Sequence, residues 1–367
     1  MANGKNGVHV HLPSRIFKFF GTLLLIVVLL ALALVIFLTV TEFKPEDTET
    51  VSLTGETSAD LSADKPLTVM TWNIGYGALG DNADFFMDGG KMVDTATPER
   101  VEANLRGMRE VILEQNPDLL LLQEADRSSK RSHHIDECEF FAGSLPRSEW
   151  AFANNFKVAF LPYPIPPIGK VDSGIATFSK FSSQEAERVS LPNPFSWPMR
   201  MANLKRCLLI NRIPIEVSDK KLILINLHLE AYDSGEGKIA QTKMLREILE
   251  QESQGGNYVI AGGDFNQIFS NADLTAYPAQ EGKWQPGIID VSEFDPKWQF
   301  LMDSGTPSCR SLDQPLAGAD TRNFQFYLID GFLVSDNISV QSLETLDLGF
   351  VYTDHNPVLL RCTLKKD

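Results

Sequence analysis

The chain has few cysteines. Among its 367 residues it has four, Cys138, Cys207, Cys309 and Cys362, and none of them belongs to a CxxC pair. This number and spacing exclude a disulfide-rich scaffold and a zinc site built on paired cysteines. Cys207 and Cys362 lie in apolar runs and are expected in the core. Cys138 and Cys309 lie in polar segments, and they could pair with each other if this part of the chain is outside the cell.

Basic residues are also in short supply. There are 33 Lys and Arg against 48 Asp and Glu, which gives a formal net charge of −15. A negative field repels nucleic acid and anionic lipid unless a metal ion or a local basic patch intervenes. The composition therefore disfavours a dedicated nucleic-acid-binding protein. It does not exclude a nuclease, because such an enzyme brings a cation into its site.

One long uncharged run stands near the N-terminus. Residues 19–41 contain no charged side chain and are long enough to span a hydrocarbon core. Lys5, Arg15 and Lys18 precede this run, whereas mainly acidic residues follow it. The bias predicts a single-pass protein of the cell membrane, with residues 1–18 in the cytoplasm and the rest outside. The alternative is a cleaved signal peptide, although the run is longer than a typical signal core and no small-x-small site follows it.

Two further segments make up the rest of the chain. Residues 42–64 are rich in Thr, Ser, Glu and Asp and have few large apolar side chains. Such a composition is typical of a flexible linker. Residues 65–367 have the apolar and polar alternation of a folded domain.

This domain is predicted to be α/β. Thr97-Pro98 has the pattern of a helix start, and apolar residues at positions 101, 105, 108 and 112 lie on one helical face. Apolar strand-like runs begin near residues 67, 119, 173, 221, 257, 324 and 357. Two regions, 173–225 and 324–364, have no room for helices between strands, so antiparallel pairing is required there. We therefore expect a four-layer α/β sandwich in which two mixed β-sheets pack face to face with helices outside.

Polar side chains recur where these strands end. Each one alone is often only a turn residue or a helix cap, but strand ends that meet at one rim form a shared cleft. The sharpest signal is Gly262-Gly263-Asp264-Phe265-Asn266, in which glycines permit close backbone approach. The candidate residues are Asn73, Glu124, His228, Asp264, Asn266, Asp330, Asp354 and His355.

The motifs that hold these residues resemble, in order, those of the endonuclease/exonuclease/phosphatase superfamily. They are TWNIG, LLLLQE, NLHLE, GGDFN, LIDGFLV and TDHNPV, and the likeness runs from about Leu67 to Leu364. The superfamily includes secreted deoxyribonucleases, apurinic-site endonucleases, bacterial sphingomyelinases and inositol-polyphosphate phosphatases. The resemblance implies a metal-dependent hydrolase of phosphoric esters, and His228 makes the chain look closer to the deoxyribonuclease and sphingomyelinase branches.

The resemblance also implies a role for each candidate residue. Asn73, Glu124 and Asp354 would form the site of a Mg²⁺ ion, with Mn²⁺ and Ca²⁺ as alternatives and Glu124 as a direct ligand. Asp264 would position and deprotonate the attacking water. The remaining residues would contact or orient the phosphate: His228, Asn266, and His355 oriented by Asp330.

The substrate remains open at this stage. Loops at 161–168 and 191–201 are rich in proline and aromatic residues, so they either rim a lipid-binding cleft or form rigid connections packed on a sheet edge. We expect a phosphodiesterase that acts on a lipid headgroup, and the alternatives are an extracellular nuclease for DNA or RNA and an inactive binding module. The membrane is contacted through residues 19–41, and no protein partner is evident.

Overall fold

The computed structural model describes residues 14–57 and 59–366, and the chain divides into two compact units after Glu42. The first unit contains one helix, α1 (Ser14–Val40). Its residues Ile16–Val40, with a mean hydropathy of 3.4, are long and apolar enough to cross a membrane, a test that a signal sequence also passes. Most of the segment predicted to be cytoplasmic, 1–18, lies outside the described residues.

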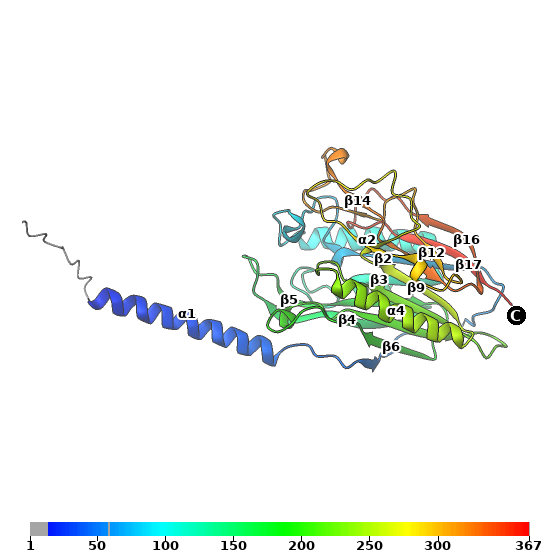
Figure 1. Ribbon diagram of the computed structural model, residues 1–367, viewed down its shortest axis with the longest axis horizontal. Coiled ribbons are helices and arrows are strands. Elements are labelled where there is room, and N and C mark those ends of the chain that lie inside the picture. The colour runs from blue at the N-terminus through cyan, green and yellow to red at the C-terminus, as the bar shows by residue number, and fades with distance from the viewer. Residues whose placement is uncertain (1–13, 58, 367) are drawn as a thin grey trace, which may run out of the picture. The chain divides into compact units, whose positions relative to one another are not determined.

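The second unit contains two large mixed sheets (Figure 1). In the first sheet β8 and β9 are parallel neighbours and the other neighbours are antiparallel. Its strands, in spatial order, are β1 (Thr48–Thr50), β6 (Glu185–Ser190), β7 (Cys207–Pro214), β8 (Lys221–His228), β9 (Tyr258–Asp264), β15 (Asp330–Val334) and β12 (Gln299–Leu301).

The second sheet follows the same plan, because β2 and β3 are parallel and the other neighbours are antiparallel. Its order is β16 (Ile338–Thr345), β17 (Val358–Leu364), β2 (Leu67–Asn73), β3 (Leu119–Asp126), β5 (Gly169–Ser179) and β4 (Glu149–Leu161). Two small pairs complete the strands, β10 (Gln267–Phe269) with β11 (Gly287–Ile289) and β13 (Cys309–Arg310) with β14 (Phe326–Tyr327).

Three apolar layers hold the sheets and helices together. Leu119 and Leu121 of β3 face the first sheet, where they join Leu224 and Ile260 in a buried core between the sheets. The alternate residues of β3 point the other way, toward α2 (Pro98–Gln115) and α3 (Glu137–Ala142). Helix α4 (Glu236–Gln254) covers the outer face of the first sheet. This is the expected four-layer sandwich, and it explains why β3 is apolar at consecutive positions.

Helix α2 begins as its sequence predicts. The Thr97 side chain accepts a hydrogen bond from Arg100 N, Pro98 occupies the first turn, and Asn116 ends the helix in the left-handed conformation. One predicted strand is divided, however. The run from Phe324 forms β14 and β15, which pair in different sheets, and the Ser308 hydroxyl accepts from two amides at the crossing.

The segment predicted to be a flexible linker is ordered against the domain from Phe43 onward. Strand β1 pairs with the edge strand β6, and Thr54 forms a bridge with Trp150. Val51 and Leu53 pack against a small core cluster beneath this edge. The composition of residues 42–64 was misleading because two apolar side chains and an open sheet edge suffice to bind a polar strand.

The pairing considered for Cys138 and Cys309 is wrong, because all four cysteines are free and buried. Cys138, on α3, lies in a core cluster with residues of α2, and Cys309 lies in a separate cluster with Tyr327 and Ile329. Local polarity failed as a guide here because neighbouring side chains from distant segments bury both thiols.

Leu121→Ala should lower the free energy of unfolding by about 2–5 kcal/mol, because it opens a cavity between the sheets. The matched control is Leu113→Ala, whose side chain is 48% exposed on α2 and whose loss should cost less than about 0.5 kcal/mol. Denaturant titration of the detergent-solubilised chain, followed by tryptophan fluorescence, measures both. Equal losses in the two variants would contradict the assigned core.

Candidate active site

Strand register places three candidate residues side by side. In the first sheet, His228 at the end of β8 is the partner of Asp264 at the end of β9. Asp264 is in turn the partner of Asp330, the first residue of β15. Because the antiparallel strand β15 begins where β9 ends, all three side chains lie at one edge of the sheet.

Asp264 lies at the centre of the contacts in the cluster. Its Oδ2 lies 3.3 Å from His228 Nε2 and 3.9 Å from His355 Nε2, and it accepts a hydrogen bond from Asn73 Nδ2 at 3.1 Å. Its Oδ1 accepts from the backbone N of Asn266 at 2.9 Å. The side chain of Asn266 donates to the Leu229 carbonyl, so its contact with Asp264 is made by the backbone.

His355 is held by a second carboxylate. Its Nδ1 lies 2.8 Å from Asp330 Oδ2, and its Nε2 faces Asp264 and, at 4.0 Å, Asp354 Oδ2. The His355 carbonyl accepts from the indole of Trp72, which ties the loop before β17 to strand β2 of the same sheet. His355 is therefore fixed in orientation from both its ring and its backbone.

The second sheet and the loop before β17 supply the other acidic residues of the cluster, Glu124 and Asp354. Asn73 Nδ2 donates to Glu124 Oε1 at 3.4 Å as well as to Asp264, while its Oδ1 accepts from Gly75 N. The amide of Asn73 thus bridges the carboxylates of the two sheets. Asp354 is 6% exposed and accepts at Oδ1 from Thr353.

Local backbone features make this arrangement possible. Glu124 has a positive φ of 54° and lies at a register shift between β3 and β5, which turns its side chain out of the regular alternation. Gly263 has a φ of 147°, and a Cβ there would lie 2.0 Å from the Leu227 carbonyl oxygen. Only glycine fits between β8 and β9 directly before Asp264.

Burial and neighbouring charges set the ionisation of the cluster. The pKa of Asp264 is raised to about 7, chiefly by burial and next by the charge of Asp330. Burial opposes a charged His355, but Asp330 and other negative neighbours outweigh it and raise the pKa of that imidazole well above its usual value. Burial, followed by Arg206, lowers the pKa of His228 well below its usual value. These shifts favour the charged form of His355 and the neutral form of His228.

A polar network lies between the sheets directly behind the cluster. Gln123 Nε2 donates to Asn226 Oδ1 at 2.7 Å and to Thr71 Oγ1 at 3.1 Å. Asn226 Nδ2 donates to the carbonyls of Leu122 and Ala176 in the opposite sheet. These bonds join the sheets one or two residues before Asn73, Glu124 and His228, so they fix the distance across the rim.

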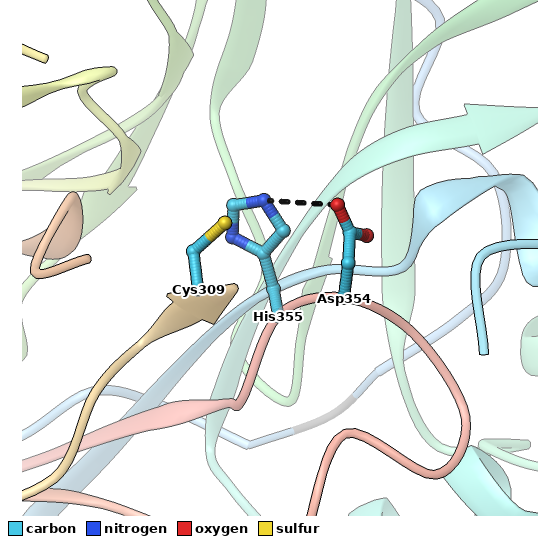
Figure 2. Close-up of side chains that lie close together, drawn as sticks. All are labelled: Cys309, Asp354 and His355. Carbon is cyan, nitrogen blue, oxygen red and sulfur yellow. Dashed lines mark ion pairs between the residues drawn. The ribbon is translucent and has the colours of Figure 1, made fainter. Parts of the chain in front are cut away.

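All eight candidate residues therefore lie in one connected cluster, but two neighbouring residues, Arg131 and Cys309, were not predicted. The Arg131 guanidinium lies 3.6 Å from the centre of the Tyr76 ring and binds Asp126 through two nitrogens. Cys309 lies beside His355 (Figure 2). Arg131 stands in a turn and Cys309 begins the two-residue strand β13, so neither follows a long apolar strand, the pattern that identified the others.

The donor set fits a hard divalent cation. Glu124 and Asp354 offer carboxylate oxygens, and the side chain of Glu124 is 26% exposed, which leaves room for the waters that Mg²⁺ retains. The pKa of Glu124 is raised by burial; Arg131 opposes this, whereas Asp354 adds to it. A cation between the two carboxylates would relieve that repulsion. Asn73 donates to Glu124 through its amide nitrogen, and its oxygen accepts from Gly75, so it orients this side of the site.

Comparison with known proteins agrees with this geometry. The model of the endonuclease/exonuclease/phosphatase family matches residues 70–355. No curated protein matches the chain in sequence.

Among solved structures, the chain is similar to an endonuclease/exonuclease/phosphatase from Beutenbergia cavernae DSM 12333, with 18% identity, a TM-score of 0.52, and 82% of this chain and 72% of that chain covered. A family protein from Bacteroides thetaiotaomicron gives 14% identity, a TM-score of 0.53, and 82% and 99% covered. The human Nocturnin catalytic domain gives 18% identity, a TM-score of 0.50, and 86% and 97% covered. At these identities the likeness shows the fold alone.

Gly75→Ala should damage the acidic side of the cluster. A Cβ there would lie 2.7 Å from Thr353 Oγ1 and 3.1 Å from Asp354 Oδ1, on a backbone with a φ of 50°. Gly282→Ala is the control, because Gly282 also has a positive φ but open space around it. The control should lose about 1–2 kcal/mol through backbone strain alone. Gly75→Ala should lose more and should also weaken Mg²⁺ binding measured by calorimetry. Equal behaviour of both variants would exclude crowding at Asp354.

Proposed function

The chain belongs to the endonuclease/exonuclease/phosphatase family, whose members are metal-dependent hydrolases of phosphoric esters, and we propose that it is a membrane-anchored phosphodiesterase acting on lipid headgroups. The observation that carries the chemistry is the convergence of two imidazoles and an amide on the buried carboxylate of Asp264. No other carboxylate in the described cluster has this environment.

In the proposed reaction, Asp264 accepts a proton from the attacking water. A pKa of about 7 suits a general base at neutral pH, and the hydrogen bonds from Asn73 and Asn266 orient its two oxygens. His228 donates one N–H to a phosphate oxygen while remaining neutral. The aspartate and this imidazole lie on adjacent parallel strands, so the water and the phosphate are held by one rigid sheet edge.

His355 serves the opposite side of the phosphate. Asp330 binds its Nδ1 and keeps the ring protonated, and Nε2 points into the cluster. We assign it to the stabilisation of phosphate oxygens and to proton donation to the leaving oxygen. Glu124 and Asp354, oriented by Asn73 and Thr353, would hold Mg²⁺, which supplies charge neutralisation at the phosphate when bound.

Exposed apolar side chains support a lipid substrate. Tyr163 and Ile165, on the β4–β5 loop, are 69% and 93% exposed. Trp197 and Met199, on the loop before β7, are 54% and 64% exposed. Aromatic and aliphatic side chains on proline-rich loops are suited to the membrane interface.

The β4–β5 loop is connected to the candidate active site through Phe86 and Asp88. The Tyr163 ring meets the Phe86 ring at 5.9 Å. The pKa of Asp88, two residues after Phe86, is raised to about 6, chiefly by burial, and the charges of Asp354 and Glu124 add to this. Asp88 also accepts a hydrogen bond from Tyr232, four residues after His228. The short helix Phe86–Asp88 therefore connects the exposed β4–β5 loop with the segment that follows His228. Together with the apolar helix α1, this supports a substrate in a bilayer.

We also propose that the N-terminus is cytoplasmic and the domain faces outward, because basic residues precede the helix and acidic residues follow it. Cysteine labelling from outside intact cells tests this. A reagent that cannot cross the membrane should label Arg147→Cys, at an exposed position on the domain, without permeabilisation. Labelling only after permeabilisation would reverse the orientation.

Asp264→Asn should lower kcat by about 10²–10⁴ without unfolding the chain, because it removes the general base but keeps the shape of the side chain. Asp273→Asn, at an exposed loop position, changes the same charge and should leave kcat unaltered. The assay uses the detergent-solubilised full chain with sphingomyelin, phosphatidylcholine, phosphoinositides, plasmid DNA and RNA, with Mg²⁺ or with chelator.

Chelator-sensitive cleavage of a phospholipid, lost in Asp264→Asn, is the expected result. Cleavage of DNA or RNA alone would replace the lipid proposal with that of an anchored nuclease. Equal activity of the wild type and Asp264→Asn would remove the proposed role of this carboxylate.

Ile165→Ser should lower activity toward phospholipid in vesicles about tenfold, because burial of one isoleucine side chain contributes about 1.5 kcal/mol. Its activity toward a water-soluble phosphodiester should stay the same. Val217→Ser is the matched control, since Val217 is fully exposed on the β7–β8 turn, at the opposite end of β8 from His228. A loss on both substrates would point to a structural effect instead.

A further inference from the structure

Cys309 is held beside His355 by backbone pairing, although the proposed reaction makes no use of its thiol. The two residues form an isolated antiparallel bridge. Arg310 N donates to the Asp354 carbonyl at 3.0 Å, and Asn356 N donates to the Ser308 carbonyl at 2.8 Å. Because these bonds flank the pair, Cys309 and His355 form a non-hydrogen-bonded pair, the kind whose side chains approach most closely.

Three different ligand types meet at this point. One donor atom from each of Cys309, Asp354 and His355 lies within 4.8 Å of the other two, and all three residues are buried. Figure 2 shows the sulfur beside the imidazole ring and the Asp354 carboxylate facing the ring nitrogen on the other side. His355 Nε2 and Asp354 Oδ2 are 4.0 Å apart.

We propose that Cys309, His355 and Asp354 form an inhibitory site for Zn²⁺. Thiolate, imidazole and carboxylate are the ligands that Zn²⁺ takes, whereas Mg²⁺ does not bind sulfur. Zinc bonds of about 2.0–2.3 Å place ligand atoms roughly 3.5 Å apart, so side-chain movements of about 1 Å close the site around the ion. A water completes the fourth position.

Binding replaces the Cys309 thiol proton by the metal and releases that proton to the buffer, because zinc takes the thiolate form. Occupation also withdraws two residues from hydrolysis. Asp354 leaves the proposed Mg²⁺ site, and His355 loses the free nitrogen that faces the phosphate. The inhibitory part of this inference rests on the proposed function, whereas metal binding by the three residues does not.

Cobalt binding to the full chain in detergent tests the site without an activity assay. Co²⁺ bound to thiolate gives a charge-transfer absorption in the near ultraviolet, and Zn²⁺ should displace it. Wild type should show this band, Cys309→Ser should lose it, and Cys138→Ser, which removes an equally buried thiol elsewhere in the domain, should keep it. A band that survives in Cys309→Ser, or no band in wild type, overturns the proposal.

Zinc inhibition of Mg²⁺-supported hydrolysis is the second measurement. Cys309→Ser should keep activity in the absence of zinc and should raise the zinc concentration for half-inhibition about tenfold or more, because one ligand is lost. Cys309→Ala serves as a second variant, and circular dichroism monitors folding of both. Unchanged zinc sensitivity would contradict the proposed site and would show that inhibitory zinc binds through another set of ligands, such as Asp264, Asp330 and His355. An inactive wild type that still binds Co²⁺ through Cys309 would contradict only the proposed function.

Discussion

One largely buried rim holds four carboxylates, those of Glu124, Asp264, Asp330 and Asp354. The rest of the structure has to compensate the repulsion between them. Like charges removed from water repel one another strongly, and burial alone raises the free energy of each ionised group. In this chain two imidazoles and the Asn73 amide lie among the carboxylates, and the Arg131 guanidinium opposes the negative field at Glu124. A divalent cation would complete the compensation.

Rigid packing holds these charges together. The leucine and isoleucine layer between the sheets sets their separation, and the bonds of Gln123 and Asn226 cross that layer directly behind the rim. Gly263 allows β8 and β9 to approach where a side chain could not fit. The fold can hold this acidic rim because the free energy gained by burying apolar side chains in the core exceeds the free energy lost through charge repulsion at the rim.

The proposed function combines hydrolysis at this rim with contact to a bilayer. The β4–β5 loop and the loop before β7 expose large apolar side chains. Strand β1 pairs with β6 inside the segment whose composition predicted a flexible linker. Cys309 adds a soft sulfur atom next to the hard oxygen atoms, so potential metal ligands of different character stand close together.

Much of this protein was predictable from its sequence. Apolar periodicity and strand-end polarity identified both halves of the sandwich and all eight residues of the cluster, because backbone hydrogen bonding and burial act on short segments. Other features depend on residues far apart in the chain. They are the pairing of β1 with the sheet edge, the division of the strand from Phe324, and the positions of Arg131 and Cys309. Only the tertiary structure decided these, because an open sheet edge, a strand register and a burial site are made by neighbours that no local pattern specifies.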